Sequence, residues 1–158
     1  MSEARGASEH EALWAAYRRT VFEARTPLGL IEIRVDQRHE DLDRLLERTG
    51  HESWCLITAW NPGSRPLSLE ENRRRNALLR DQIVREGRPF HEGIGRGEDP
   101  KWAPEESFLV LGVARDEAIE LGRSWGQIAV VWGERGKGAE LVGCHARSAS
   151  PSSAKEIW

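Results

Sequence analysis

The sequence has little cysteine, little lysine and no long hydrophobic run. Its two cysteines, Cys55 and Cys144, are too few for a structural zinc site, which needs about four ligands in local pairs. A disulfide between them is not expected in a reducing compartment. No apolar run approaches the roughly 20 residues that cross a bilayer, so no membrane partner is expected. The N-terminus has no basic start followed by an apolar core, so we expect no secretory signal and a cytoplasmic protein.

The charge is nearly balanced, with 23 Lys and Arg against 26 Asp and Glu and a formal net charge of -3. General nucleic-acid binders are usually basic overall, so nucleic acid is not expected as the main partner. A length of 158 residues fits one domain with its own hydrophobic core. Neither a cofactor nor an oligomeric state can be predicted from the composition.

The first half of the chain alternates helical and strand patterns. Ser8 and Glu11 form a capping box, Gly29 completes a turn between two apolar runs, and Gly50 can end a helix. The predicted elements are, in order, a helix at 8–19, strands at 21–25 and 30–35, a helix over the stripe Leu42, Leu45 and Leu46, and a buried strand at 54–60.

The second half continues this alternation. A second capping box, Ser68 with Glu71, predicts a long helix at 68–86, and Asp116 can cap another helix that ends at Gly126. Strands are predicted near 90–94, where glycines interrupt the pattern, and at 106–113, 127–132 and 139–142. We therefore expect an α+β fold, with one domain over 1–143, a mixed β-sheet and about four helices, followed by a loosely ordered tail at 144–158.

Two asparagines lie on the apolar stripe of the long helix. At 100° per residue, Asn72 and Asn76 share a face with Leu79 and Ile83. A buried polar group without a partner costs about 1–3 kcal/mol, so both carboxamides need hydrogen bonds. They can bond the backbone of the preceding loop, or they can point into a pocket at the end of the strand.

One run of residues resembles a known family. Ile57-Thr58-Ala59-Trp60-Asn61-Pro62, followed by Ser68, Asn72, Asn76 and Leu79, is similar to an uncharacterised bacterial family, domain of unknown function 3293. Trp102 with Glu105-Glu106-Ser107-Phe108, and Gly126-Gln127 before Ala129-Val130-Val131-Trp132, fit the same pattern, so the resemblance covers 54–142. Ile128 departs from it, since a polar residue is expected there. The family implies no activity.

The first functional hypothesis is a ligand site at the corner between the strand at 54–60 and the helix at 68–86. The side chains at strand ends or on the inward helix face are candidate contacts for a small anionic or nucleotide-like ligand: Thr58, Asn61, Asn72, Asn76, Ser107 and Gln127. The start of the helix would favour an anion, and Trp60 or Trp102 could stack on a planar ring. The alternative is a structural hydrogen-bond network that fixes the core.

Glu105 and Glu106 are candidate catalytic residues, if the ligand is a substrate. Neighbouring residues in a strand face opposite ways, so Glu106 shares a face with Phe108 and Glu105 shares one with Ser107. A carboxylate at the mouth of an apolar strand can have a raised pKa and act as a base. The alternative is a solvated strand end or a salt bridge to an arginine.

The arginines of the long helix support a different class of function. Arg73, Arg74 and Arg75 begin a series that continues along the helix, and such a series could make the protein a non-catalytic protein- or RNA-interaction module. Acidic residues at i,i+4-type spacing favour a salt-bridged, solvated face instead. The alternating glycines Gly93, Gly95 and Gly97 could admit a phosphate, although a bulged hairpin explains them more simply.

Overall fold

The computed structural model describes residues 2–98 and 103–144, with side chains from residue 11 onward. The helices in this part of the chain are α1 (Ser2–Arg19), α2 (Glu40–Thr49), α3 (Leu69–Arg85) and α4 (Arg115–Ser124), with a short 3₁₀ turn at Pro62–Ser64. The expected α+β class with about four helices is confirmed. The predicted tail falls outside the described residues except for Cys144.

The strands form one seven-stranded sheet in the order β2-β1-β4-β5-β3-β6-β7. Their bounds are β1 Val21–Thr26, β2 Gly29–Ile33, β3 Ser53–Ile57, β4 Phe90–Arg96, β5 Glu105–Leu111, β6 Ala129–Glu134 and β7 Glu140–Gly143. We expected a mixed sheet, but all six pairings are antiparallel. The reason is that none of the three helical connections joins neighbouring strands: β1, β4 and β5 lie between β2 and β3, β5 lies between β3 and β4, and β3 lies between β5 and β6.

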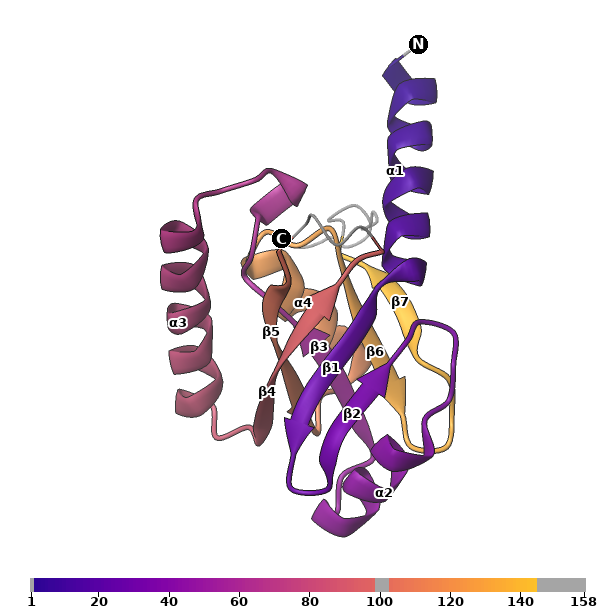
Figure 1. Ribbon diagram of the computed structural model, residues 1–158, viewed down its shortest axis with the longest axis vertical. Coiled ribbons are helices and arrows are strands. Elements are labelled where there is room, and N and C mark those ends of the chain that lie inside the picture. Colours follow the sequence, from indigo (N-terminus) through magenta and orange to yellow (C-terminus); the bar gives the residue numbers. More distant parts are fainter. Residues whose placement is uncertain (1, 99–102, 145–158) are drawn as a thin grey trace.

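The sheet curls, and its two edge strands approach each other at one end (Figure 1). The segment after β2 meets the residue before β7 through two backbone hydrogen bonds. Asp36 N–H donates to Ala139 O at 2.8 Å, and Ala139 N–H donates to Gln37 O at 2.9 Å. This contact closes one end of the curl, beside α2.

Each face of the sheet carries its own hydrophobic cluster. The inner face packs against α2, and its core includes Ile33, Leu46, Trp54 and Leu109. The outer face is covered by α3 and α4, and its core includes Ile57, Leu79, Val110 and Leu121. Because side chains alternate along β5, Glu105 and Ser107 belong to the inner face and Glu106 to the outer one.

Several element boundaries differ from those predicted. The strand expected to reach Trp60 ends at Ile57, because side chains bond the backbone that follows it. Helix α1 begins at Ser2 rather than Ser8, since the preceding Glu, Ala and Arg are good helix formers. Asp116 does not cap α4: the helix starts after Ala114, whose N–H donates to Glu117 Oε1 at 2.9 Å.

The glycine-rich segment forms a regular strand, β4, paired on both sides. Within the described residues, no helix combines the length and the apolar character needed to span a bilayer.

Candidate functional site

Asn76 joins α3 to the end of β3 and the start of β5. The residue is 3% exposed. Asn76 Oδ1 accepts a hydrogen bond from Ala59 N–H at 2.7 Å, and Nδ2 donates to Glu106 O at 2.8 Å. The side chain therefore satisfies two backbone groups that the sheet leaves unpaired where β3 ends.

Asn72 holds Asn61, two residues further along the loop, in a similar way. It is 2% exposed; Asn72 Oδ1 accepts from Asn61 N–H, and Nδ2 donates to Asn61 Oδ1, both at 2.8 Å. Asn61 itself has φ 44° and ψ 65°, a left-handed conformation that costs a non-glycine residue about 1 kcal/mol or more and that asparagine tolerates better than most.

Three further side chains complete this corner network, which comprises Thr58, Asn61, Asn72, Arg75, Asn76 and Gln127. Thr58 Oγ1 donates to Glu106 O at 2.6 Å, and Gln127 Nε2 donates to Trp60 O at 3.1 Å. Arg75 donates from Nε to Ala59 O and from Nη2 to Trp125 O, both at 2.7 Å. Four elements, β3, α3, β5 and α4, thus meet at the loop after β3. Hydrogen bonds from side chains to backbone groups join most of them, as expected if the polar residues form a structural network.

Glu105 and Ser107 lie on the inner face, at the end of β5 away from α2. Ser107 Oγ is buried and has no hydrogen-bond partner among the described residues. The Asn61 side chain lies close to the Glu105 carboxyl and acts on it as a hydrogen-bond donor. Burial of that carboxyl raises the pKa of Glu105, and the bond from Asn61 opposes the rise. The residue as a whole still keeps an exposed surface, so a solute can reach it.

Glu106 points to the outer face, where Arg73 Nε lies 3.5 Å from its carboxylate. Glu106 therefore has the salt bridge to an arginine that was considered as the alternative to a catalytic role. Its backbone oxygen has the larger structural role, because it accepts from both Thr58 and Asn76.

Two aromatic residues near this site were not anticipated from the sequence. Strand register places Phe22 of β1 opposite Gly95 of β4, and Gly95 opposite Glu105. A Cβ built on Gly95 would lie 3.1 Å from the Phe22 ring, so the ring covers the glycine. Tyr17 of α1 is also near: burial raises its pKa, and the charge of Glu105 adds to the rise. Only the pairing of β1 with β4, which local patterns do not predict, brings these residues together. We call Phe22, Asn61, Gly95, Glu105 and Ser107 the inner rim.

Trp60, one of the two tryptophans predicted to stack on a planar ligand, is 6% exposed and offers little surface to a ligand. Trp102 lies outside the described residues. The start of α3 is also occupied: Ser68 Oγ accepts from Glu71 N–H at 3.0 Å, and Glu70 and Glu71 place negative charge in the first turn, which disfavours an anion there.

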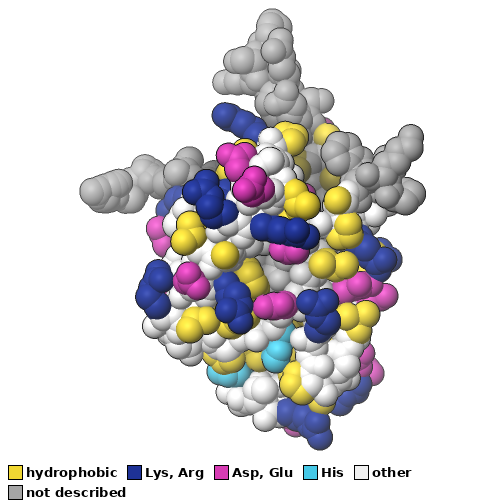
Figure 2. All heavy atoms as spheres, turned by 60° about the vertical axis from the view of Figure 1, so that its left-hand side comes forward, with side chains coloured by type: hydrophobic (Ala, Val, Ile, Leu, Met, Phe, Trp, Pro, Cys, Tyr) yellow, Lys and Arg dark blue, Asp and Glu magenta, His cyan; other side chains and the backbone are white. Residues whose placement is uncertain are grey.

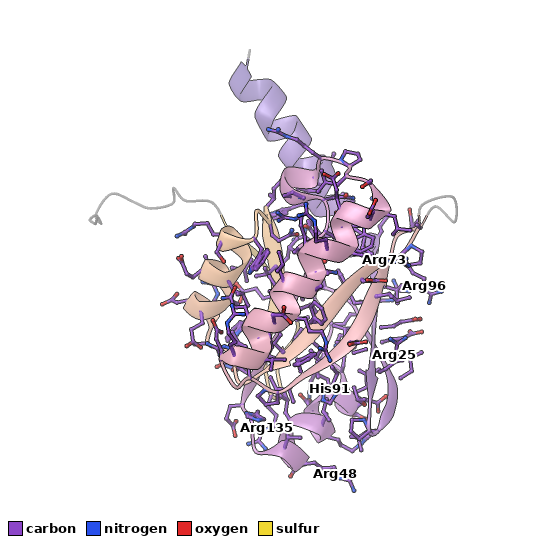
Figure 3. The ribbon with its side chains drawn as sticks, turned by 90° about the vertical axis from the view of Figure 1, so that its left-hand side faces the viewer. Arg25, Arg48, Arg73, His91, Arg96 and Arg135 are labelled. Carbon is purple, nitrogen blue, oxygen red and sulfur yellow. The ribbon has the colours of Figure 1, made fainter. Side chains whose placement is uncertain are left out.

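Some arginines of α3 and the adjoining strands lie close to acidic partners. Arg80 Nε lies 3.3 Å from Glu92, and Arg25 Nη2 lies 3.7 Å from the same carboxylate. Arg73, Arg25 and Arg96 lie on one side of α3 (Figure 3), and basic and acidic side chains are interspersed over this face (Figure 2). The surface is salt-bridged as expected, but these ion pairs join arginines of α3 and β1 to carboxylates on β4 and β5 and do not follow the i,i+4-type spacing along the helix.

Two open grooves lie elsewhere on the described surface, and neither is lined by a predicted ligand-binding residue. One, of about 360 Å³, lies between the end of α3 and α4 around Arg88 and Glu117. The other, of about 350 Å³, lies beside α2 around Asp43 and Arg135. The described residues contain no group of three His, Cys, Asp or Glu side chains able to hold a metal ion.

Comparisons with known proteins identify one family. The curated proteins and the solved structures give no match to this chain. A family model described as Protein of unknown function (DUF3293) matches residues 57–130. That stretch contains the corner network, as well as Glu105 and Ser107 of the inner rim. The resemblance to this family read from the sequence is confirmed over residues 57–130.

Proposed function

We propose that the protein binds a small ligand, nucleotide-like or anionic, at the corner where β3 ends beside α3. Asn61, Glu105 and Ser107 are the groups that contact it, and the rest of the corner network holds Asn61 in position. The observation that carries this proposal is the Ser107 hydroxyl, which is buried without a partner among the described residues. Buried polar groups are nearly always hydrogen-bonded, so such an oxygen is a natural contact for a bound molecule.

The strained backbone of Asn61 supports the same location. Residues held in sparsely populated conformations cluster at ligand sites, where the surrounding structure over-determines them. Here Asn72 fixes both the N–H and the side-chain oxygen of Asn61, which leaves the amide nitrogen to bond Glu105. The pair forms a preorganised polar edge beside Ser107.

Of the two ligand classes, a nucleotide-like molecule fits better than a simple anion. The acidic side chains Glu71, Glu105 and Glu106 lie around the corner, and the start of α3 already carries negative charge. A carboxyl beside a carboxamide can instead recognise N–H and carbonyl groups on a ligand. If the ligand is a substrate, Glu105 is the residue that exchanges a proton with it, because its pKa is raised.

A cytoplasmic location is part of this proposal. Cys55 and Cys144 are both buried and both free thiols, as a reducing compartment would keep them.

A thermal-shift titration with nucleoside monophosphates and with inorganic phosphate tests the proposal. We expect a nucleotide to raise the melting temperature of the wild type. Ser107→Ala should raise the melting temperature of the ligand-free protein, because it removes an unpaired buried hydroxyl, and should reduce the shift caused by the nucleotide. Ser124→Ala is the matched control, since Ser124 Oγ already donates to Leu121 O. A Ser107→Ala protein with an unchanged ligand shift would contradict the proposal.

A further inference from the structure

The inner rim combines a polar edge with an aromatic ring. Phe22, Gly95 and Glu105 occupy one row across the adjacent strands β1, β4 and β5. Neighbouring strands lie about 4.8 Å apart, and residues that pair directly point to the same face. Phe22 and Glu105 are therefore separated on the inner face only by a residue without a side chain.

Gly95 allows the Phe22 ring to lean toward Glu105. The nearest atoms to a Cβ placed on Gly95 would be two carbons of the Phe22 ring, both at 3.1 Å. Any larger residue at this position would push the ring away from β4. The next row also has a glycine on β4 between its two other residues, because Ser107 pairs with Gly93, and Gly93 pairs with Ala24.

Phe22 remains partly exposed while packing against the inner core. One side of the ring is thus supported by the protein, and some of its surface is open to solvent. Glu105 is exposed as well, and Asn61 bonds its carboxyl. An apolar surface and a hydrogen-bonding edge therefore stand side by side at the end of the curled sheet away from α2.

We propose that the inner rim binds a planar heteroaromatic ring of the nucleobase type, which packs against Phe22 and directs its N–H groups to Glu105. This inference rests on the proposed function and specifies its ligand. Asn61 lies beside the Glu105 carboxyl as a hydrogen-bond donor, and Ser107 supplies a further hydroxyl. A carboxylate accepts hydrogen bonds only, so a ring that presents N–H donors, such as guanine, is favoured over one that presents acceptors alone.

Calorimetric titration with guanosine, ribose 5-phosphate and inorganic phosphate tests the inference on the full chain. We expect guanosine to bind and the two non-aromatic compounds to bind far more weakly. Phe22→Leu should weaken guanosine binding by about tenfold, the size expected for a lost aromatic contact. Glu105→Gln should weaken it as well without disturbing the ring.

Phe90→Leu is the matched control. Phe90 is also a partly buried strand phenylalanine, but it packs on the outer face, with its ring 5.8 Å from that of Phe108. The control should lose stability without losing affinity for guanosine. Guanosine binding that is equal in wild type and Phe22→Leu would overturn the inference.

The test also separates this inference from the proposed function. If ribose 5-phosphate or phosphate binds with a dependence on Ser107 and guanosine does not, the site exists but takes no ring, and the inference alone fails. If none of the three compounds binds at millimolar concentration, both proposals fail.

Discussion

Asn72 and Asn61 are joined by two hydrogen bonds of 2.8 Å, one to the backbone and one to the side chain of Asn61. This reciprocal pair explains how a buried polar residue is accommodated on the apolar stripe of α3. It also explains why β3 ends at Ile57, since the backbone after Ile57 forms hydrogen bonds with side chains instead of with a neighbouring strand. The loop after β3 is therefore held by α3 rather than by the sheet.

Asn72→Ala is expected to destabilise the protein by about 1–3 kcal/mol, because it leaves the partly buried Asn61 N–H without its acceptor. Urea unfolding measured by tryptophan fluorescence gives this difference. Arg74→Ala on the exposed side of the same helix is the control and should change the free energy of unfolding by about 0.5 kcal/mol or less. Equal effects of the two substitutions would mean that the Asn72–Asn61 pair contributes no stability.

Gly126→Ala tests the contact between the α4–β6 turn and the loop after β3. Gly126 has φ 76°, and a Cβ there would lie 2.8 Å from Pro62 Cβ. Gly136 has a similar φ of 85° but faces open space, so Gly136→Ala carries the backbone strain alone. We expect Gly126→Ala to lower the melting temperature more than Gly136→Ala does. The reverse order would argue against close packing of these two segments.

Stability should fall below neutral pH in part because of His39. Its Nε2 accepts a hydrogen bond from Arg34 N–H at 3.0 Å, and burial lowers its pKa from the usual 6.5. The His39 side chain therefore binds a proton less readily in the folded protein than in the unfolded chain. Its contribution to the free energy of unfolding is constant above pH 6.5 and is lost as the pH falls from there through the pKa of the folded state. Unfolding free energies of wild type and His39→Gln, compared at pH 7.5 and pH 5, should differ in slope. Parallel profiles would exclude His39 as a source of the pH dependence.

Glu105→Gln should make the ligand-free protein more stable near neutral pH while weakening ligand binding. The raised pKa of Glu105 means that the folded state disfavours the ionised carboxyl. Stability in the wild type should therefore increase as pH falls through that pKa, and the neutral amide should already have this gain at pH 7. Such an exchange of stability for binding is typical of functional residues. Urea unfolding at pH 7 and at pH 4 gives the sign of the difference in the free energy of unfolding between Glu105→Gln and the wild type. A Glu105→Gln protein that is less stable than the wild type at pH 7 would be the contrary result.

The sequence predicts the local elements well and their arrangement less well. The N-cap at Ser68, the helix-ending Gly50 and the alternation of Glu105 and Glu106 depend on a few neighbouring residues, and the structure agrees with each of them. The position of β4 between β1 and β5 depends on pairings over long sequence separations, which leave no local signal. For that reason Asn72 and Asn76 could be placed inward from helix phase alone, whereas Phe22 could not be placed beside Glu105.

Chemical-shift mapping tests ligand binding at the inner rim most directly. Guanosine 5′-monophosphate, which carries both a ring and a phosphate, is titrated into the ¹⁵N-labelled chain and amide shifts are followed. We predict saturable changes centred on Phe22, Asn61, Glu105 and Ser107. No change at millimolar nucleotide, or changes confined to the groove around Arg88 and Glu117, would contradict the account.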